Sequence, residues 1–110
     1  GQGWLTMEEV VWDNDGKLKT FSPSTYKIPA INDTPAEFNV EIFKNGSNVE
    51  KVVNKQKTTG EPPLMLAMSV FFAIKDAIAS VMDYKKTPKL DAPATPEKIL
   101  MSISELKSKI

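Results

Sequence analysis

Two segments near the start of the chain have the character of strands, and a turn signal separates them. Residues 4–13 are rich in aromatic and β-branched side chains, and residues 17–21 alternate between polar and apolar positions. The turn signal Asn14-Asp15-Gly16 lies between them, and its Asp-Gly pair supplies the positive φ angles that a tight hairpin requires. This pattern predicts a β-hairpin.

The same alternation returns after a loop. Residues 26–34 contain Pro29 and are followed by Pro35, which favours an extended loop over a helix. Residues 37–44 alternate again, and residues 49–53 form a further short apolar segment. Together the segments within residues 4–53 predict a small antiparallel sheet of three or four strands with one apolar face.

A helical period begins after residue 60. From residue 64 to residue 74 only Ser69 is polar, and apolar side chains then recur at helical spacing. The pattern predicts a long buried helix over residues 62–82. Its two leading prolines are compatible with a helix start, because the first N–H groups of a helix have no partner within it. The unbroken apolar run is shorter than a membrane span of about 20 residues and Lys75-Asp76 interrupts the helix, so we expect no membrane contact.

The end of the chain predicts a linker over residues 84–94 and a C-terminal helix over residues 96–109, whose start carries the capping pair Thr95-Pro96. The expected fold class is therefore α+β, with the sheet followed by the long buried helix and the C-terminal helix. The first turns of the long helix are apolar on every side, and a small sheet cannot cover them. We therefore expect residues 1–110 to be part of a larger domain.

Composition excludes several function classes. The 14 basic residues of the 110-residue chain are all Lys and are balanced by 14 acidic residues, which argues against nucleic-acid binding. The chain has no Cys and no His, so it cannot form disulfides, ligate an iron–sulfur cluster or provide an imidazole or thiolate nucleophile. Carboxylates, Lys, Tyr and hydroxyl groups remain for chemistry, and no metal ligand set is expected from this chain.

Glu61 is the main candidate for chemistry. It stands between Gly60 and Pro62-Pro63 at the start of the predicted helix, where the helix dipole favours an anion. One interpretation is a plain N-terminal carboxylate that stabilises the helix. The other is a general base held in a fixed direction by its neighbours. The helix terminus lowers the pKa of such a carboxyl and desolvation raises it, and the sequence leaves the balance open.

A family resemblance favours the second interpretation. The run from Gly60 to Ile78 closely resembles the segment around the catalytic glutamate of the xanthine dehydrogenase/oxidase family, the molybdenum hydroxylases. Four further stretches resemble the C-terminal region of that family in the same order, at residues 4–9, 23–30, 35–38 and 92–99. The resemblance implies that the chain is the C-terminal part of a molybdopterin-binding domain in a much larger enzyme.

The resemblance also implies an activity and its cofactors. Glu61 matches the general base for hydroxylation of purines, hypoxanthine and xanthine to urate, at a molybdenum centre held by molybdopterin. Thr59 and Gly60 would line this cofactor through their backbone, although Thr59 departs from the small apolar residue usual there. FAD and [2Fe–2S] clusters would lie elsewhere in the parent enzyme, outside this chain. The implied process is purine catabolism in the cytoplasm, or alternatively in the peroxisome.

The resemblance implies three partners: a purine substrate, the remainder of the parent polypeptide and a second copy of the parent in a homodimer. The chain alone is expected to be inactive, because the other active-site residues of the family belong to segments that precede Gly1. The pair Pro62-Pro63 favours the purine branch, and an aldehyde oxidase-type molybdenum hydroxylase is the alternative. A different alternative is a non-catalytic module that self-associates through its apolar helix.

Overall fold

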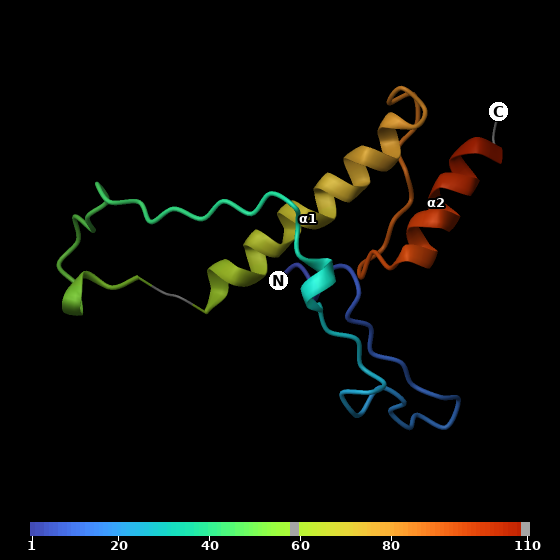
Figure 1. Cartoon of the computed structure of the whole chain (residues 1–110), viewed down its shortest axis with the longest axis horizontal. Coiled ribbons are helices and arrows are strands. Elements are labelled where there is room, and N and C mark those ends of the chain that lie inside the picture. Colours follow the sequence, from blue (N-terminus) through green and yellow to red (C-terminus); the bar gives the residue numbers. More distant parts are fainter. Residues whose placement is uncertain (58–59, 109–110) are drawn as a thin grey trace.

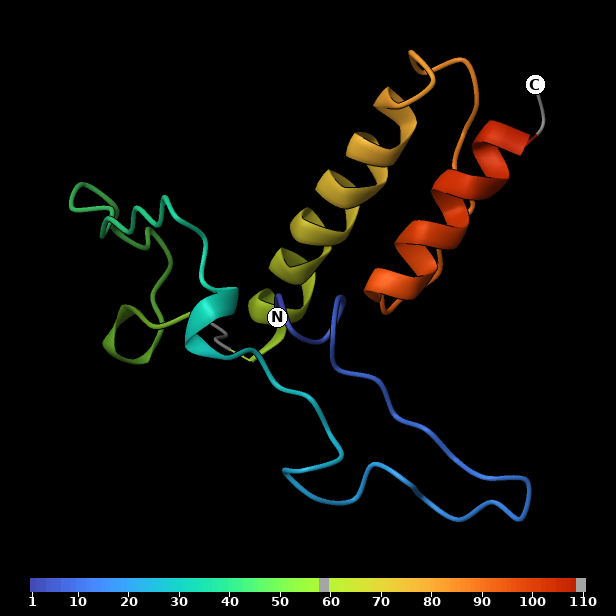
Figure 2. The same cartoon turned by 45° about the vertical axis from the view of Figure 1, so that its right-hand side comes forward.

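Two helices and a long irregular N-terminal half make up the molecule. The helices lie side by side and run in the same direction, because the linker between them returns along their length (Figures 1 and 2). The structure is a computed structural model, and it describes residues 1–57 and 60–108. Its elements are two short 3₁₀ helices, η1 (Ile31–Asp33) and η2 (Val53–Lys55), and two α-helices, α1 (Glu61–Ser80) and α2 (Pro96–Ser108).

Local sequence explains both ends of α1. Its first turn contains Pro62 and Pro63, which cost no internal hydrogen bond at this position. The helix ends where Asp83 and Tyr84 adopt left-handed φ angles of 49° and 58°. The Tyr84 N–H then donates to the Ala79 carbonyl at 3.1 Å and closes the last turn. With 20 residues, α1 is about 30 Å long.

A small apolar core joins α1, the linker and α2. Thr95 caps α2: its Oγ1 accepts the Lys98 N–H at 3.4 Å and its carbonyl accepts the Ile99 N–H at 2.9 Å. Partly buried side chains on both helices and the linker surround the core. The buried residues of this core are Ile78, Leu90, Ala94 and Leu106.

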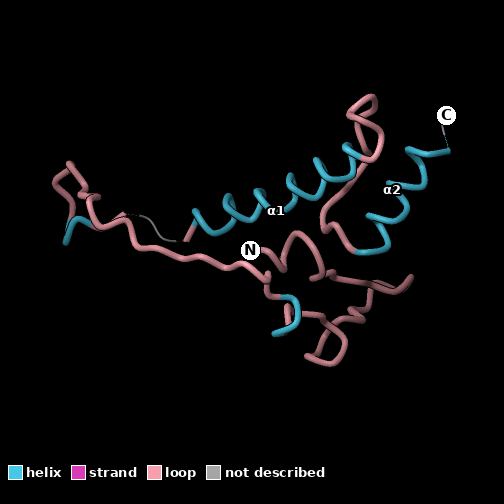
Figure 3. The backbone as a smooth tube through the Cα atoms, turned by 45° about the horizontal axis from the view of Figure 1, so that its top comes forward, coloured by secondary structure: helices cyan, strands magenta, loops and turns pink. Residues whose placement is uncertain are grey.

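The expected sheet over residues 4–53 is wrong, because the described residues contain no strand (Figure 3). The predicted turn is present, with Gly16 at a φ of 77° and the Asp13 N–H donating to the Lys17 carbonyl at 3.0 Å. Beyond this turn, the two segments are paired by an isolated antiparallel bridge between Trp12 and Leu18. Two strands alone bury too little apolar surface to form a stable sheet, so the hairpin ends after its turn.

Residues 34–52 form an extended arm that projects away from the helices (Figure 1). Backbone groups of residues 35–47 make no hydrogen bond to any other described part of the chain. Apolar side chains of the arm are exposed, including Phe38, Val40 and Ile42. The alternating pattern is therefore present, but no strand in the described part of the chain pairs with it.

The long helix is present, and the described chain does not bury it, in agreement with the expectation that its first turns lack partners here. Within α1, the buried side chains are Ala67 and Ile78, and apolar residues such as Leu66 and Phe72 are exposed. By length and composition alone α1 could cross a membrane, a property that core helices of larger proteins share. Its exposure here arises because no apolar layer from the described residues covers most of its N-terminal half.

The whole chain is much more open than a domain of its size. Its Cα radius of gyration is 18.5 Å, compared with about 13 Å for a compact domain of 110 residues. The accessible surface is 9276 Å², compared with about 6,100 Å² for a compact protein of the same mass.

Candidate functional site

Glu61 is the first residue of α1, and its side chain is exposed. Within the described ranges, no hydrogen bond or ion pair engages its carboxylate. Apart from its chain neighbours, no described residue places an atom within 4 Å of the position that a Cβ on Gly60 would occupy, so this side of the helix start is open. The structure thus places Gly60 and Glu61 together at an accessible end of α1. Thr59, the third site residue expected from the sequence, lies outside the described residues.

The two prolines limit what this helix start can bind. A helix N-terminus usually attracts anions through its free N–H groups. Pro62 and Pro63 have no N–H, so two of these donors are missing from the first turn. The start of α1 therefore presents a carboxylate, which suits proton transfer better than phosphate binding.

The N-terminal loop, residues 1–9, packs against this end of α1. A Cβ on Gly1 would lie 2.8 Å from the Ala67 Cβ and 3.0 Å from the Pro63 carbonyl oxygen. A residue with a side chain does not fit such a close approach without displacement of its neighbours. Sequence reasoning missed this contact, because the two residues are far apart along the chain and no local pattern marks the contact.

Hydrogen bonds connect the same loop to other parts of the fold. The Gly3 carbonyl accepts three N–H groups, from residues 6–8, at 3.0–3.1 Å. The Thr6 hydroxyl donates to the Gln2 carbonyl at 2.7 Å, and the Gln2 side chain donates to the Asp33 carbonyl at 3.4 Å. The loop therefore joins the start of α1 to η1.

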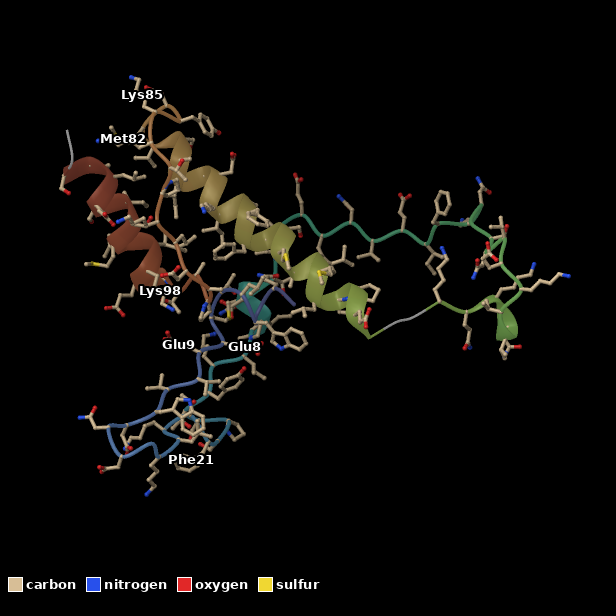
Figure 4. All side chains as sticks on the ribbon, turned by 180° about the vertical axis from the view of Figure 1, so that it is seen from behind. Glu8, Glu9, Phe21, Met82, Lys85 and Lys98 are labelled. Atoms are coloured by element: carbon tan, nitrogen blue, oxygen red, sulfur yellow. The ribbon has the colours of Figure 1, made fainter. Side chains whose placement is uncertain are left out.

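The loop also contacts the start of α2. The Ala94 N–H donates to the Leu5 carbonyl at 2.7 Å, and Lys98 forms an ion pair with Glu9 at 3.2 Å (Figure 4). The neighbouring Glu8 carboxylate accepts the Tyr26 hydroxyl at 2.7 Å. This hydrogen bond raises the pKa of Tyr26, because the phenol donates to an anion and lies beside its negative charge. These polar groups hold the loop in place and serve a structural role.

Comparison with known proteins identifies the relatives of this chain. A family model described as "Molybdopterin cofactor-binding domain" matches residues 1–35. "Xanthine dehydrogenase/oxidase" of Rattus norvegicus is 47% identical over 104 residues, which cover 90% of this chain and 8% of the relative. "Xanthine dehydrogenase" of Dictyostelium discoideum is 47% identical over 105 residues, covering 93% and 8% of the two chains. "Xanthine dehydrogenase 1" of Arabidopsis thaliana is 44% identical over 112 residues, again covering 93% and 8%.

The chain is related to the xanthine dehydrogenase/oxidase family. The resemblance seen in the sequence is thereby confirmed, and the matches support an oxidoreductase family with molybdopterin and molybdenum as its cofactor. The chain spans about 8% of the length of these xanthine dehydrogenase relatives. FAD, the [2Fe–2S] clusters, the homodimer and the cytoplasmic or peroxisomal location remain predictions for a longer protein.

The side chains of this chain are better suited to lie beside the molybdenum cofactor of xanthine dehydrogenase than to ligate its metal. In the described part of the chain, no group of three or more acidic side chains could hold a metal ion. The sequence also provides no Cys or His. An exposed carboxylate beside a glycine with open surroundings is compatible with a cofactor whose metal is held by a pterin.

Proposed function

We propose that this chain contributes the general base of a molybdenum hydroxylase that acts on purines, and that Glu61 is this base. The observation that carries the proposal is the placement of Gly60-Glu61-Pro62-Pro63 at an open helix start, in a chain 47% identical to a xanthine dehydrogenase/oxidase. The substrates would be hypoxanthine and xanthine, with urate as the final product.

Each residue of the helix start has a physical task in this proposal. The molybdopterin-held molybdenum, when bound, supplies the oxidising centre of the hydroxylation. Glu61 accepts a proton during the reaction and later releases it to solvent. The prolines restrict the backbone of the first turn and so fix the direction in which the Glu61 side chain leaves the helix. The lack of a side chain at Gly60 lets a bulky cofactor approach the backbone closely.

Two alternatives compete with this proposal. An aldehyde oxidase-type hydroxylase would use the same base on an aldehyde, and Pro62-Pro63 favours the purine branch. A non-catalytic module that self-associates is supported by the exposed apolar side chains of α1, such as Leu66 and Phe72. Turnover of xanthine against an aromatic aldehyde distinguishes the first two, and the effect of a Glu61 substitution distinguishes both from the third.

The decisive experiment is the substitution Glu61→Gln in the full-length protein that carries this chain, loaded with its cofactor. The variant keeps the shape of the side chain and removes the proton acceptor. We expect xanthine turnover to fall by about 10²- to 10⁴-fold, because general-base catalysis contributes a factor of this size. Molybdenum content and far-UV circular dichroism should stay unchanged.

Glu97 provides the matched control. It is also an exposed glutamate in the first turn of a helix, but that helix is α2 and its start lies on another part of the fold. The Glu97→Gln variant should keep full turnover. A Glu61→Gln enzyme that retains turnover within about tenfold of wild type would contradict the proposed role of Glu61.

A further inference from the structure

We infer that Gly1 is a positioning residue for Glu61. The absence of a side chain at Gly1 lets the N-terminal loop approach α1 closely, and this contact sets the position of the helix turn that carries Glu61. The inference rests on the proposed role of Glu61 as the general base. It adds a residue that the sequence comparison does not assign and that lies far from Glu61 along the chain.

The atoms around Gly1 have little freedom to move aside. A Cβ at this position would lie 2.8 Å from the Ala67 Cβ, 3.0 Å from the Pro63 carbonyl oxygen and 3.3 Å from the Ala67 Cα. Ala67 is one of the buried residues of α1, with 3% of its surface exposed. Its methyl group and the two backbone atoms have no rotatable bond that could relieve the overlap. Pro63 belongs to the same first turn as Glu61.

The loop on the other side of the contact is also held firmly. The Gly3 carbonyl accepts three backbone N–H groups, and the Leu5 carbonyl accepts the Ala94 N–H at 2.7 Å. Glu9 adds the ion pair to Lys98 at 3.2 Å. These contacts hold the loop at Gly3, Leu5 and Glu9, two or more residues beyond the exposed Gly1, so an added methyl group at Gly1 presses on the first two turns of α1 and displaces them together with Gly1.

The expected displacement is large enough to affect catalysis. Carbon atoms pack at about 3.5–4.0 Å, so a contact of 2.8 Å has to lengthen by about 1 Å. A misplacement of about 1 Å in a catalytic group can reduce the rate by about 10²-fold. The family model of the molybdopterin-binding domain matches residues 1–35, which include Gly1 but not Glu61. The contact thus fixes the base relative to the segment that carries the cofactor-domain signature.

The test uses the full-length, cofactor-loaded protein with three variants. Gly1→Ala should reduce kcat for xanthine by about 10- to 100-fold while molybdenum content stays at the wild-type level. The double variant Gly1→Ala/Ala67→Gly removes the nearest obstructing atom, the Ala67 Cβ at 2.8 Å, and leaves the Pro63 carbonyl oxygen at 3.0 Å, so it should restore most of kcat, to within about fivefold of wild type. The control is Gly46→Ala, whose close neighbour is the ring of the exposed Phe43, which is free to swing away.

Amide hydrogen exchange provides a readout that is independent of turnover. Exchange of residues 64–70 should become faster in Gly1→Ala, because the displaced helix turns lose packing against the loop. Exchange should return toward wild-type rates in the double variant and stay unchanged in Gly46→Ala. A purely destabilising effect of Gly1→Ala would not be repaired by Ala67→Gly, since glycine itself weakens a helix.

The outcomes separate this inference from the proposed function. Wild-type kcat in Gly1→Ala together with loss of turnover in Glu61→Gln overturns the positioning role and leaves the general base intact. Loss of molybdenum from Gly1→Ala, or failure of Ala67→Gly to restore turnover, also overturns it. Wild-type turnover in Glu61→Gln contradicts the proposed function itself, whatever Gly1→Ala does. Loss in Gly1→Ala with recovery in the double variant supports the inference.

Discussion

Asp33 holds the turn that precedes the extended arm through its carboxylate. One carboxylate oxygen accepts the Ala30 backbone N–H at 2.7 Å and lies 3.0 Å from the Lys27 ammonium. Both partners favour the charged form and lower the pKa of Asp33 below its ordinary value of 3.8, with the Ala30 hydrogen bond as the larger cause.

This arrangement predicts how the turn responds to acid. Because the folded pKa is lowered, Asp33 stabilises the turn fully above pH 3.8, and this contribution is lost as the pH falls through the lowered value. A carbon-13 NMR titration of the Asp33 carboxyl should show a midpoint below 3.8. In Lys27→Ala the midpoint should move up but stay below 3.8, because the Ala30 hydrogen bond remains. A midpoint at or above 3.8 in the wild-type chain would show that the turn does not form.

Single residues differ in how far their roles follow from the sequence. The turn at Gly16 was predicted, because Asp-Gly between two strand-like segments requires a local positive φ and little else. The helix-start position of Glu61 was predicted for the same local reason. The close approach of Gly1 to Ala67 was not, because the two residues meet only after the chain has folded.

At the level of elements, the two helices begin and end close to the predicted residues. The prolines and Thr95 mark the starts of α1 (Glu61–Ser80) and α2 (Pro96–Ser108), and these signals act within one turn. The predicted strands did not form, because a strand is completed by hydrogen bonds to another strand and none lies beside residues 35–47 in the described chain. Alternation therefore indicated the extended backbone but not a sheet.

The pairing of α1 with α2 predicts a clear difference between two aliphatic substitutions. Ile78 on α1 is buried in the core between the helices, whereas Leu100 on α2 is exposed. Ile78→Ala should lower the free energy of unfolding by about 2–4 kcal/mol through lost burial and a new cavity. Leu100→Ala should change it by no more than about 0.5 kcal/mol. Urea titration followed by circular dichroism measures both values, and equal effects would contradict this packing of the helices.

On the scale of the whole molecule, the open shape is the dominant feature. A radius of gyration of 18.5 Å and an accessible surface of 9276 Å² show that the arm and much of α1 lie outside any core. The chain spans about 8% of its xanthine dehydrogenase relatives, so a large amount of polypeptide could supply the missing contacts in a longer protein. Exposed apolar surface of this extent favours association when no such polypeptide is present.

We therefore predict that the isolated chain does not behave as a compact monomer. Small-angle X-ray scattering at low concentration should give a radius of gyration well above the value of about 13 Å for a compact domain. At higher concentration, size-exclusion chromatography should show self-association through the apolar side chains of α1.

A paired substitution on α1 tests the cause of this association. The variant Leu66→Lys/Phe72→Lys places two charges on exposed positions of the helix and should reduce association without loss of helical content. Lys107→Glu, on α2, changes the net charge at an exposed polar site and should leave association unchanged. A compact monomer at all concentrations would contradict the open structure.

The sequence alone determined the features that depend on near neighbours: the turn at Gly16, the starts of both helices, the position of Glu61 and the family resemblance. Tertiary structure decided which faces are buried, the absence of a sheet in the described residues and the contact between Gly1 and α1. The physical reason is the separation along the chain of the residues that each interaction joins. Caps, turns and helical hydrogen bonds join residues within a few positions of each other, whereas burial and strand pairing require surfaces that are distant along the chain or belong to other polypeptide.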